Sequence, residues 1–379
     1  MAHLRRRVLA MVAAVAATLL PIPAQATPGV AEPGEQGARS FIVTLESGAD
    51  APAAIQRHSV APTHRYQRVL NGFAAPLSAR QVAALRADPA VAMVEPDGVA
   101  TIVATQVNPP SWGLDRIDQR NLPLNNQYTF NTTAANVHAY IIDTGIDAGH
   151  TEFEGRASQV VNTVGGPNRD CNGHGTHVAG TVGAESYGVA KDVRLYGVKV
   201  LNCSGSGSWS SVIAGMDWVA ANHTKPAVAN LSLGGGFNSS VNNALNNLAN
   251  RGVFVVSAAG NSNANACDFS PASASNSTTV MASSSSDARA SFSNFGTCAH
   301  LYAPGVAITS TTPRNGTATF NGTSMAAPHV AGVAARYKAT FGDAGFSTIR
   351  TWLINNSTTG VIAGNPSGTP NRLLYTNGL

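Results

Sequence analysis

The chain has 379 residues, which is enough for one large domain or for two to three small ones. Hydrophobic residues make up 44% of it and charged residues only 12%, which excludes a disordered protein and a coiled coil. The net charge of +4 is small for this length, so the composition gives no reason to expect nucleic acid or an anionic membrane as a partner.

The first residues predict an export signal. Arg5-Arg6-Arg7 form a basic start, Val8 to Leu20 form an apolar stretch, and Ala24-Gln25-Ala26 supplies the small residues of a cleavage site after Ala26. The alternative, a retained membrane anchor, is disfavoured because the apolar stretch is short for a bilayer. We therefore expect a signal peptide at residues 1–26 and a secreted, extracellular protein that is not held in a membrane.

Residues 27–103 are predicted to form a separate α+β unit, whose ordered part spans about 40–99. Phe41 to Leu45 alternates like a strand, Gln81 to Asp88 has a short helical pattern, and Val91 to Glu95 again alternates like a strand. Such a small unit has a marginal core and is expected to need a partner surface. Val99 to Asn108 is expected to be a weakly structured junction and a proteolytic boundary.

Residues 104–379 show strand-like and helix-like segments in alternation. Strands are predicted at 137–143, 193–201, 228–233 and 253–256, and helices at 174–182, 212–221 and 241–249. This order predicts an α/β fold with a mainly parallel sheet and helices on both faces. In such sheets functional groups gather at the carboxyl ends of the strands.

Three residues at such positions carry reactive side chains. Ser324 comes two residues after Gly322 at a predicted helix start, where a serine is either an N-cap or an exposed nucleophile. His174 lies between glycines at another helix start, as suits a general base that approaches the substrate closely. Asp143 ends an apolar strand, where a carboxylate is costly unless an imidazole N–H or a similar donor binds it.

Two further residues have alternative interpretations. His177 lies three residues after His174, but no H-E-x-x-H element accompanies the pair, so a zinc site is disfavoured. Asn261 follows an apolar strand, where it is either an ordinary turn residue or a side-chain donor in an oxyanion hole together with the Ser324 N–H.

Four cysteines lie in the second half of the chain, at Cys171, Cys203, Cys267 and Cys298. Three disulfide pairings are possible, and the grouping along the chain favours Cys171–Cys203 with Cys267–Cys298. A metal site is disfavoured because there is no C-x-x-C spacing.

Three segments together resemble the signatures of the subtilisin-like serine proteases: Ile141 to Gly145, His174 to Gly180 and Gly322 to Pro328. They occur in the order Asp, His, Ser that is typical of that family. From about Trp112 to Tyr375 the chain is most similar to the proteinase K subfamily and, within it, to aqualysin-type enzymes, whose cysteine positions it shares.

The resemblance implies a serine endopeptidase with the triad Asp143, His174 and Ser324, and with Asn261 in the oxyanion hole. It implies that residues 41–99 are an inhibitor-type propeptide and that self-cleavage falls near Val103-Ala104. It also implies that the backbone of a protein substrate adds as a strand between two edges of the substrate-binding cleft. The edges are Gly205-Ser206-Gly207 and Ser232-Leu233-Gly234, and the walls of the primary pocket are Ser257, Ala258, Ala259 and Gly260. Small uncharged walls predict broad specificity with a preference for apolar or aromatic residues.

No catalytic cofactor is expected, and the chain is expected to be a monomer. The resemblance implies structural calcium as an option, and the family commonly has an aspartate that binds calcium before Leu301-Tyr302-Ala303-Pro304-Gly305. This chain has His300 there, a poor ligand for calcium, so that one site is not expected while sites elsewhere stay open. The competing interpretations are an inactive subtilase-fold binding module and an esterase of the α/β-hydrolase type. The esterase is disfavoured because it requires G-x-S-x-G and the order Ser, Asp, His.

Overall fold

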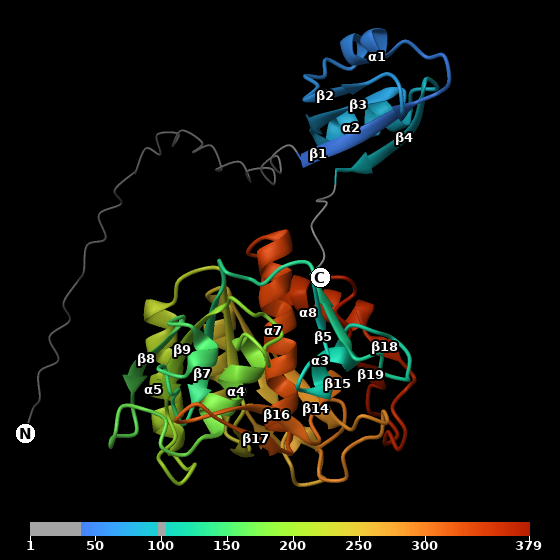
Figure 1. Cartoon of the computed structure of the whole chain (residues 1–379). Helices are drawn as coiled ribbons and strands as arrows, with labels where there is room; N and C mark the ends of the chain where they lie inside the picture. Colours follow the sequence, from blue (N-terminus) through green and yellow to red (C-terminus); the bar gives the residue numbers. More distant parts are fainter. Residues whose placement is uncertain (1–38, 98–103) are drawn as a thin grey trace, which may run out of the picture. The chain divides into compact units, whose positions relative to one another are not determined.

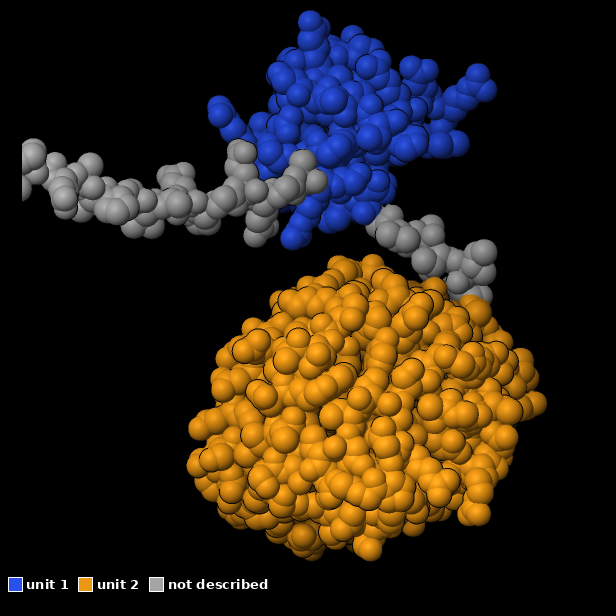
Figure 2. All heavy atoms as spheres, turned by 90° about the vertical axis from the view of Figure 1, so that its left-hand side faces the viewer, with its two compact units in different colours: residues 1–100 blue, residues 101–379 orange. Residues whose placement is uncertain are grey.

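The computed structural model describes residues 39–97 and 104–379. The chain divides into two compact units, residues 1–100 and residues 101–379, which Figure 2 shows in two colours. The described residues do not include the predicted signal peptide (1–26) or the leader up to residue 38. They also do not include residue 103, after which the predicted cleavage falls. Within the described ranges, no helix combines the length and the apolar character that a membrane span requires.

The small unit is a four-stranded antiparallel sheet with two helices. Its sheet has the order β2-β3-β1-β4, and its elements are β1 (Arg39–Leu45), α1 (Ala51–Arg57), β2 (His64–Tyr66), β3 (Gly72–Leu77), α2 (Ala79–Arg86) and β4 (Val91–Pro96). The predicted strands and the predicted helix are confirmed, whereas α1, β2 and β3 were not expected. Helix α2 begins at a capping box, because Ser78 accepts from the N–H of Gln81 while the Gln81 side chain accepts from the N–H of Ser78.

The large unit is built on a nine-stranded sheet with the order β18-β19-β15-β14-β12-β10-β7-β9-β8. All neighbours are parallel except β18 and β19, which confirms the predicted mainly parallel sheet. The strands are β7 (His138–Asp143), β8 (Ala157–Asn162), β9 (Arg194–Lys199), β10 (Ala227–Leu231), β12 (Val253–Ala258), β14 (Thr278–Ser283), β15 (Leu301–Pro304), β18 (Thr358–Thr359) and β19 (Arg372–Leu373).

Helices cover both faces of this sheet (Figure 1). Helices α4 (His174–Gly183) and α7 (Thr323–Phe341) pack against each other and against the central strands. Helices α5 (Trp209–Asn222) and α6 (Ser239–Asn250) form a second pair, and α3 (Trp112–Ile117) and α8 (Phe346–Asn356) lie beside β15 and β12. Every residue of the central strand β12 is buried, as expected for a parallel strand with helices on both sides.

The remaining elements are short and lie outside the main sheet. They are β5 (Ala104–Val107) with β6 (Gln127–Phe130), β11 (Gly235–Gly236) with β13 (Phe269–Ser270), the hairpin β16 (Ile308–Thr312) with β17 (Gly316–Phe320), and the 3-10 turns η1 (Thr151–Phe153) and η2 (Ala266–Asp268). The expectation of weak structure up to Asn108 is therefore wrong for Ala104–Val107, which pairs antiparallel with Gln127–Phe130.

Candidate active site

The three predicted reactive residues lie at the ends of elements, as their sequence positions suggest. Asp143 is the last residue of β7, His174 is the first residue of α4, and Ser324 is the second residue of α7. His174 and Ser232 line one cleft, and Ser232 is hydrogen-bonded to Ser324, so the starts of α4 and α7 lie at the same site.

Asp143 and His174 form a direct hydrogen bond. The Nδ1–H of His174 donates to Oδ1 of Asp143 over 2.7 Å, and the same oxygen accepts the N–H of Thr144 over 2.7 Å. Asp143 is completely buried, so these donors offset the cost of a charged group in the interior. Burial by itself lowers the pKa of His174, but the charge and the hydrogen bond of Asp143, with a smaller contribution from Asp170, outweigh it and raise that pKa above its ordinary value.

The hydroxyl of Ser324 is not directed at His174 in this structure. It donates to the backbone oxygen of Ser232 over 3.0 Å, while the Ser232 hydroxyl donates to the backbone oxygen of Ser324 over 2.7 Å. Catalytic hydrogen bonds are often absent or poorly aligned without substrate, because they form fully only in the complex.

Asn261 lies beside the start of α7, and its amide oxygen is already in use. Its Oδ1 accepts the N–H of Thr323 over 2.9 Å and the hydroxyl of Thr323 over 2.8 Å. This fixes the amide plane and leaves the Nδ2 group available as a donor. A side-chain carbon placed on Gly322 would lie 3.5 Å from the Ser324 nitrogen and 3.6 Å from Nδ2 of Asn261. The absence of a side chain at Gly322 therefore leaves a space between two donors, where an oxyanion can bind.

A cleft of about 640 Å³ extends from His174. It is lined by all six residues of the two predicted edges, which are Gly205, Ser206, Gly207, Ser232, Leu233 and Gly234. Trp209, Val212 and Leu201 add an apolar surface that the sequence did not reveal. Trp209 is the first residue of α5 and follows a glycine- and serine-rich loop, so an aromatic residue at the start of a helix was the only available signal.

A second, smaller pocket of about 210 Å³ adjoins Ser324. Ala258, Ala259 and Gly260 line it as predicted from the family, together with Asn261, Phe269 and Ala272. Ser257 does not line it: its side chain is fully buried within β12, where its hydroxyl lies 2.5 Å from that of Ser277. Successive strand residues point to opposite faces, which explains why one member of a continuous segment turns away from the pocket.

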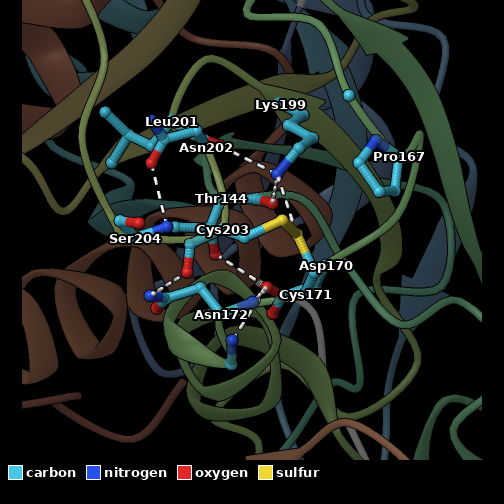
Figure 3. Close-up of a disulfide and its surroundings, with 12 residues drawn as sticks. Thr144, Pro167, Asp170, Cys171, Asn172, Lys199, Leu201, Asn202, Cys203 and Ser204 are labelled. Carbon is cyan, nitrogen blue, oxygen red and sulfur yellow. Dashed lines mark hydrogen bonds between the residues drawn. A yellow bond between two sulfur atoms is a disulfide. The ribbon is translucent and has the colours of Figure 1, made fainter.

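Two disulfides, Cys171–Cys203 and Cys267–Cys298, are formed, and they are the pairs that the grouping along the chain favours. Cys171–Cys203 joins the segment before α4 to the segment after β9, so it links the surroundings of His174 to the Gly205 edge (Figure 3). Lys199 lies beside this bridge, with its Nζ 3.8 Å from the sulfur of Cys171.

His177, three residues after His174, has a structural role. The Nε2 of His177 lies 3.1 Å from the backbone oxygens of both Ile308 and Ala318, and burial lowers the pKa of this histidine to about 4. The ring also stacks on Phe320. His177 is therefore a neutral donor that holds the hairpin β16–β17.

The surroundings of His300 do not fit a calcium ion. Its Nδ1 accepts the N–H of Thr279 over 3.1 Å, and burial together with the charges of Arg350 and Arg372 lowers its pKa to about 4. A neutral imidazole offers none of the oxygen ligands that calcium requires. Among residues 39–97 and 104–379, no group of three or more His, Cys, Asp or Glu side chains is arranged to hold a metal ion.

The mainly parallel sheet, the Asp143–His174 pair and the serine at the start of α7 define a subtilisin-like serine peptidase. Comparison with known proteins assigns the family directly. Residues 136–374 match the subtilase family, and residues 40–102 match the peptidase inhibitor I9 family. The chain belongs to the subtilase family and is a serine endopeptidase with an N-terminal inhibitor-type unit.

Individual relatives agree with this assignment. The extracellular serine proteinase of Thermus sp. (strain Rt41A) is 50% identical over 315 residues, which cover 82% of this chain and 77% of that protein. Proteinase R of Parengyodontium album is 44% identical over 353 residues, which cover 91% and 90% of the two chains. The crystal structure of a cold adapted subtilisin-like serine proteinase is 48% identical, with a TM-score of 0.68 over 70% of this chain and 97% of that one.

Proposed function

We propose that this chain is a secreted, extracellular endopeptidase that cleaves proteins through an acyl-enzyme formed on Ser324. The observation that carries the proposal is the 2.7 Å hydrogen bond between His174 and buried Asp143, beside the cleft. A histidine held in this way has Nδ1 as its donor and leaves Nε2 free to accept a proton.

The reaction takes place in two halves. His174 Nε2 accepts the proton of the Ser324 hydroxyl as Oγ attacks the carbonyl carbon of the scissile peptide bond. Asp143 stabilises the imidazolium, and the Ser324 N–H and the Asn261 amide bind the oxyanion. The imidazolium then protonates the departing amine, the C–N bond breaks, and water activated by His174 releases the acyl group. All of these groups belong to the polypeptide, so the proposal includes no cofactor.

Substrate selection follows from the two pockets. The glycine- and serine-rich edges offer backbone groups to an extended substrate, so most of the binding energy is expected to be independent of substrate sequence. The 210 Å³ pocket beside Ser324 is lined by Ala258, Ala259, Gly260 and Phe269, with no charged side chain. It suits an apolar or aromatic side chain at the residue that precedes the cleaved bond.

We also propose that the protein is made as a zymogen. Residues 1–26 would direct export, residues 27–103 would form the propeptide, and residues 104–379 would remain as the mature, monomeric peptidase. The match of residues 40–102 to an inhibitor family supports transient inhibition by the chain's own propeptide. The N-terminal sequence and the mass of the secreted protein test both cleavage positions, and its sedimentation tests the monomer.

The triad is tested by comparing the wild-type protein with Ser324→Ala in the hydrolysis of casein. Both are produced with the propeptide supplied separately, so that maturation does not depend on activity. The proposal predicts that Ser324→Ala lowers kcat by about 10⁶-fold while the folded structure persists. Casein hydrolysis by a folded Ser324→Ala at a rate near that of the wild type would overturn it. Folded wild-type protein that cleaves no peptide would instead support an inactive binding module.

A further inference from the structure

A second carboxylate lies next to the triad and is saturated with hydrogen bonds. Asp170 precedes His174 by four residues and is only 4% exposed. Its Oδ1 accepts from Thr144 Oγ1 (2.9 Å), Asn172 N (3.0 Å) and Gly173 N (2.8 Å), and its Oδ2 accepts from Thr176 N (2.9 Å) and Thr176 Oγ1 (2.6 Å). The two oxygens of this one carboxylate therefore accept from five donors, three backbone N–H groups and two hydroxyls.

These bonds complete the first turn of α4. The N-cap residue, Gly173, has no side chain, so the first N–H groups of the helix need other acceptors. The N–H of Thr176 donates to Asp170, and the N–H of Gly175 donates over 2.9 Å to the Thr144 hydroxyl, which itself donates to Asp170. Asp170 therefore holds two of the turn's N–H groups, one directly and one through Thr144.

The same bonds reach the catalytic aspartate. Thr144 follows Asp143 in the chain and donates its N–H to the Asp143 oxygen that binds His174. Asp170 thus connects the end of β7, which carries Asp143, to the start of α4, which carries His174. Figure 3 shows Asp170 and Thr144 beside the Cys171–Cys203 bridge.

The charge of Asp170 also reaches His174. The charged or titratable groups around the imidazole are Asp143 on β7, Asp170 before α4, His177 one turn along α4, and Lys199 on β9. Lys199 is fully buried and donates over 2.7 Å to the backbone oxygen of Thr144. Asp170 contributes to the raised pKa of His174, since a nearby negative charge favours the protonated ring.

We propose that Asp170 is a positioning residue for the reaction: its carboxylate fixes the start of α4 against the end of β7, and its charge supports the imidazolium that forms on His174. This inference rests on the proposed role of His174 as the general base. Asp170 does not touch the substrate; it acts through Thr144 and the first turn of α4.

The test is Asp170→Asn, which keeps the shape of the side chain. An amide has one oxygen and one NH₂ group, so in either orientation at least two of the five donors lose their acceptor. We expect kcat to fall about 10- to 100-fold with little change in KM, because orientation is lost rather than substrate binding. The acidic limb of the kcat/KM profile should move to lower pH, because removal of a negative charge lowers the pKa of His174.

Thr176→Val is the matched control. It removes one hydrogen bond to Asp170 but keeps the carboxylate, so it should lower the melting temperature without moving the acidic limb. An acidic limb that stays in place and a kcat within about twofold of wild type in Asp170→Asn would overturn the inference, since a 1 Å misplacement of a catalytic group typically costs far more.

Two further variants keep the result interpretable. If Asp170→Asn yields no folded protein, Thr144→Val cuts the link to Gly175 while it preserves the charge, and an unchanged kcat in this variant would overturn the positioning role. Ser324→Ala measured alongside separates the two proposals: an active Ser324→Ala refutes the triad, whereas an inactive Ser324→Ala with a normal Asp170→Asn refutes the role of Asp170 alone.

Discussion

Helices α4 and α7 begin in the same way but use their first N–H groups differently. Each follows a glycine N-cap, Gly173 or Gly322, that provides no side-chain hydrogen bond. At α4 the N–H groups of His174, Gly175 and Thr176 all donate to side chains. At α7 the N–H of Thr323 donates to Asn261, but within the described part of the chain no acceptor takes the N–H of Ser324.

This difference separates two uses of one structural feature. A helix start concentrates unpaired N–H groups and a partial positive charge. Where side chains saturate these groups, as at α4, the helix start is fixed and can orient a base. Where one N–H stays free, as at α7, the helix start can bind a developing negative charge. Changes at α7 should therefore affect transition-state binding, and changes at α4 should affect the geometry and the charge of His174.

Apart from the loss of Ser324 itself, the largest effect is expected at the open helix start, from Asn261→Ala. Loss of the Nδ2 donor should lower kcat by about 10²–10³-fold, because the amide stabilises the oxyanion more than the ground-state carbonyl. KM should change little. Steady-state kinetics on a short peptide measure both constants.

Asn321→Ala provides the control for this change. Asn321 is also close to Ser324, but its side chain accepts the N–H of Ala307. The substitution Asn321→Ala should therefore reduce kcat much less than Asn261→Ala does. Equal losses in the two variants would mean that Asn261 acts through local packing and not as a donor.

The next effect concerns the two disulfides, which close loops of nearly equal length, with sequence separations of 32 and 31 residues. Removal of either pair by double Cys→Ala substitution should lower the free energy of unfolding by about 3–4 kcal/mol. Only the loss of Cys171–Cys203 should also raise KM, because that bridge anchors the Gly205 edge near His174. Denaturant unfolding and peptide kinetics test this contrast, and a KM change of the same size in both variants would contradict it.

The smallest effect is a displacement of the pH profile. His174 must be neutral to accept a proton, and Asp143 raises its pKa, so activity should be lost as the pH falls through a value above 6.5, the ordinary pKa of the group. The acidic limb of kcat/KM for wild type measures this value. A midpoint below 6.5 would mean that burial, and not Asp143, dominates the environment of His174.

Much of the architecture was predictable from hydrophobic patterns. The apolar segments at 137–143 and 253–256 and the helical spacing at 241–249 correspond to β7, β12 and α6. The hairpin Ile308–Phe320 was not expected, because its threonine-rich strands pair mainly with each other and lack a continuous apolar segment. Helix α1 of the small unit was missed because Ala51–Arg57 is short and contains a proline in its first turn.

The candidate site was predictable where a helix starts directly after a glycine, as after Gly173 for His174 and after Gly322 for Ser324. Other parts depend on contacts between distant segments. No sequence spacing marks Asp170 as the acceptor of five hydrogen bonds, since its donors include Thr144, which is 26 residues away. The burial of Ser257 depends on which face of β12 its side chain occupies, and the direction of the Ser324 hydroxyl depends on the backbone oxygen of Ser232.

The central claim is that Ser324, activated by His174, is the nucleophile, and a fluorophosphonate that labels activated serines tests it most directly. Peptide mapping by mass spectrometry after labelling of the mature protein locates the adduct. We expect one adduct, on Ser324, whose formation His174→Ala slows strongly and Ser324→Ala abolishes. An adduct on another serine, or labelling of Ser324 at the same rate without His174, would contradict the account.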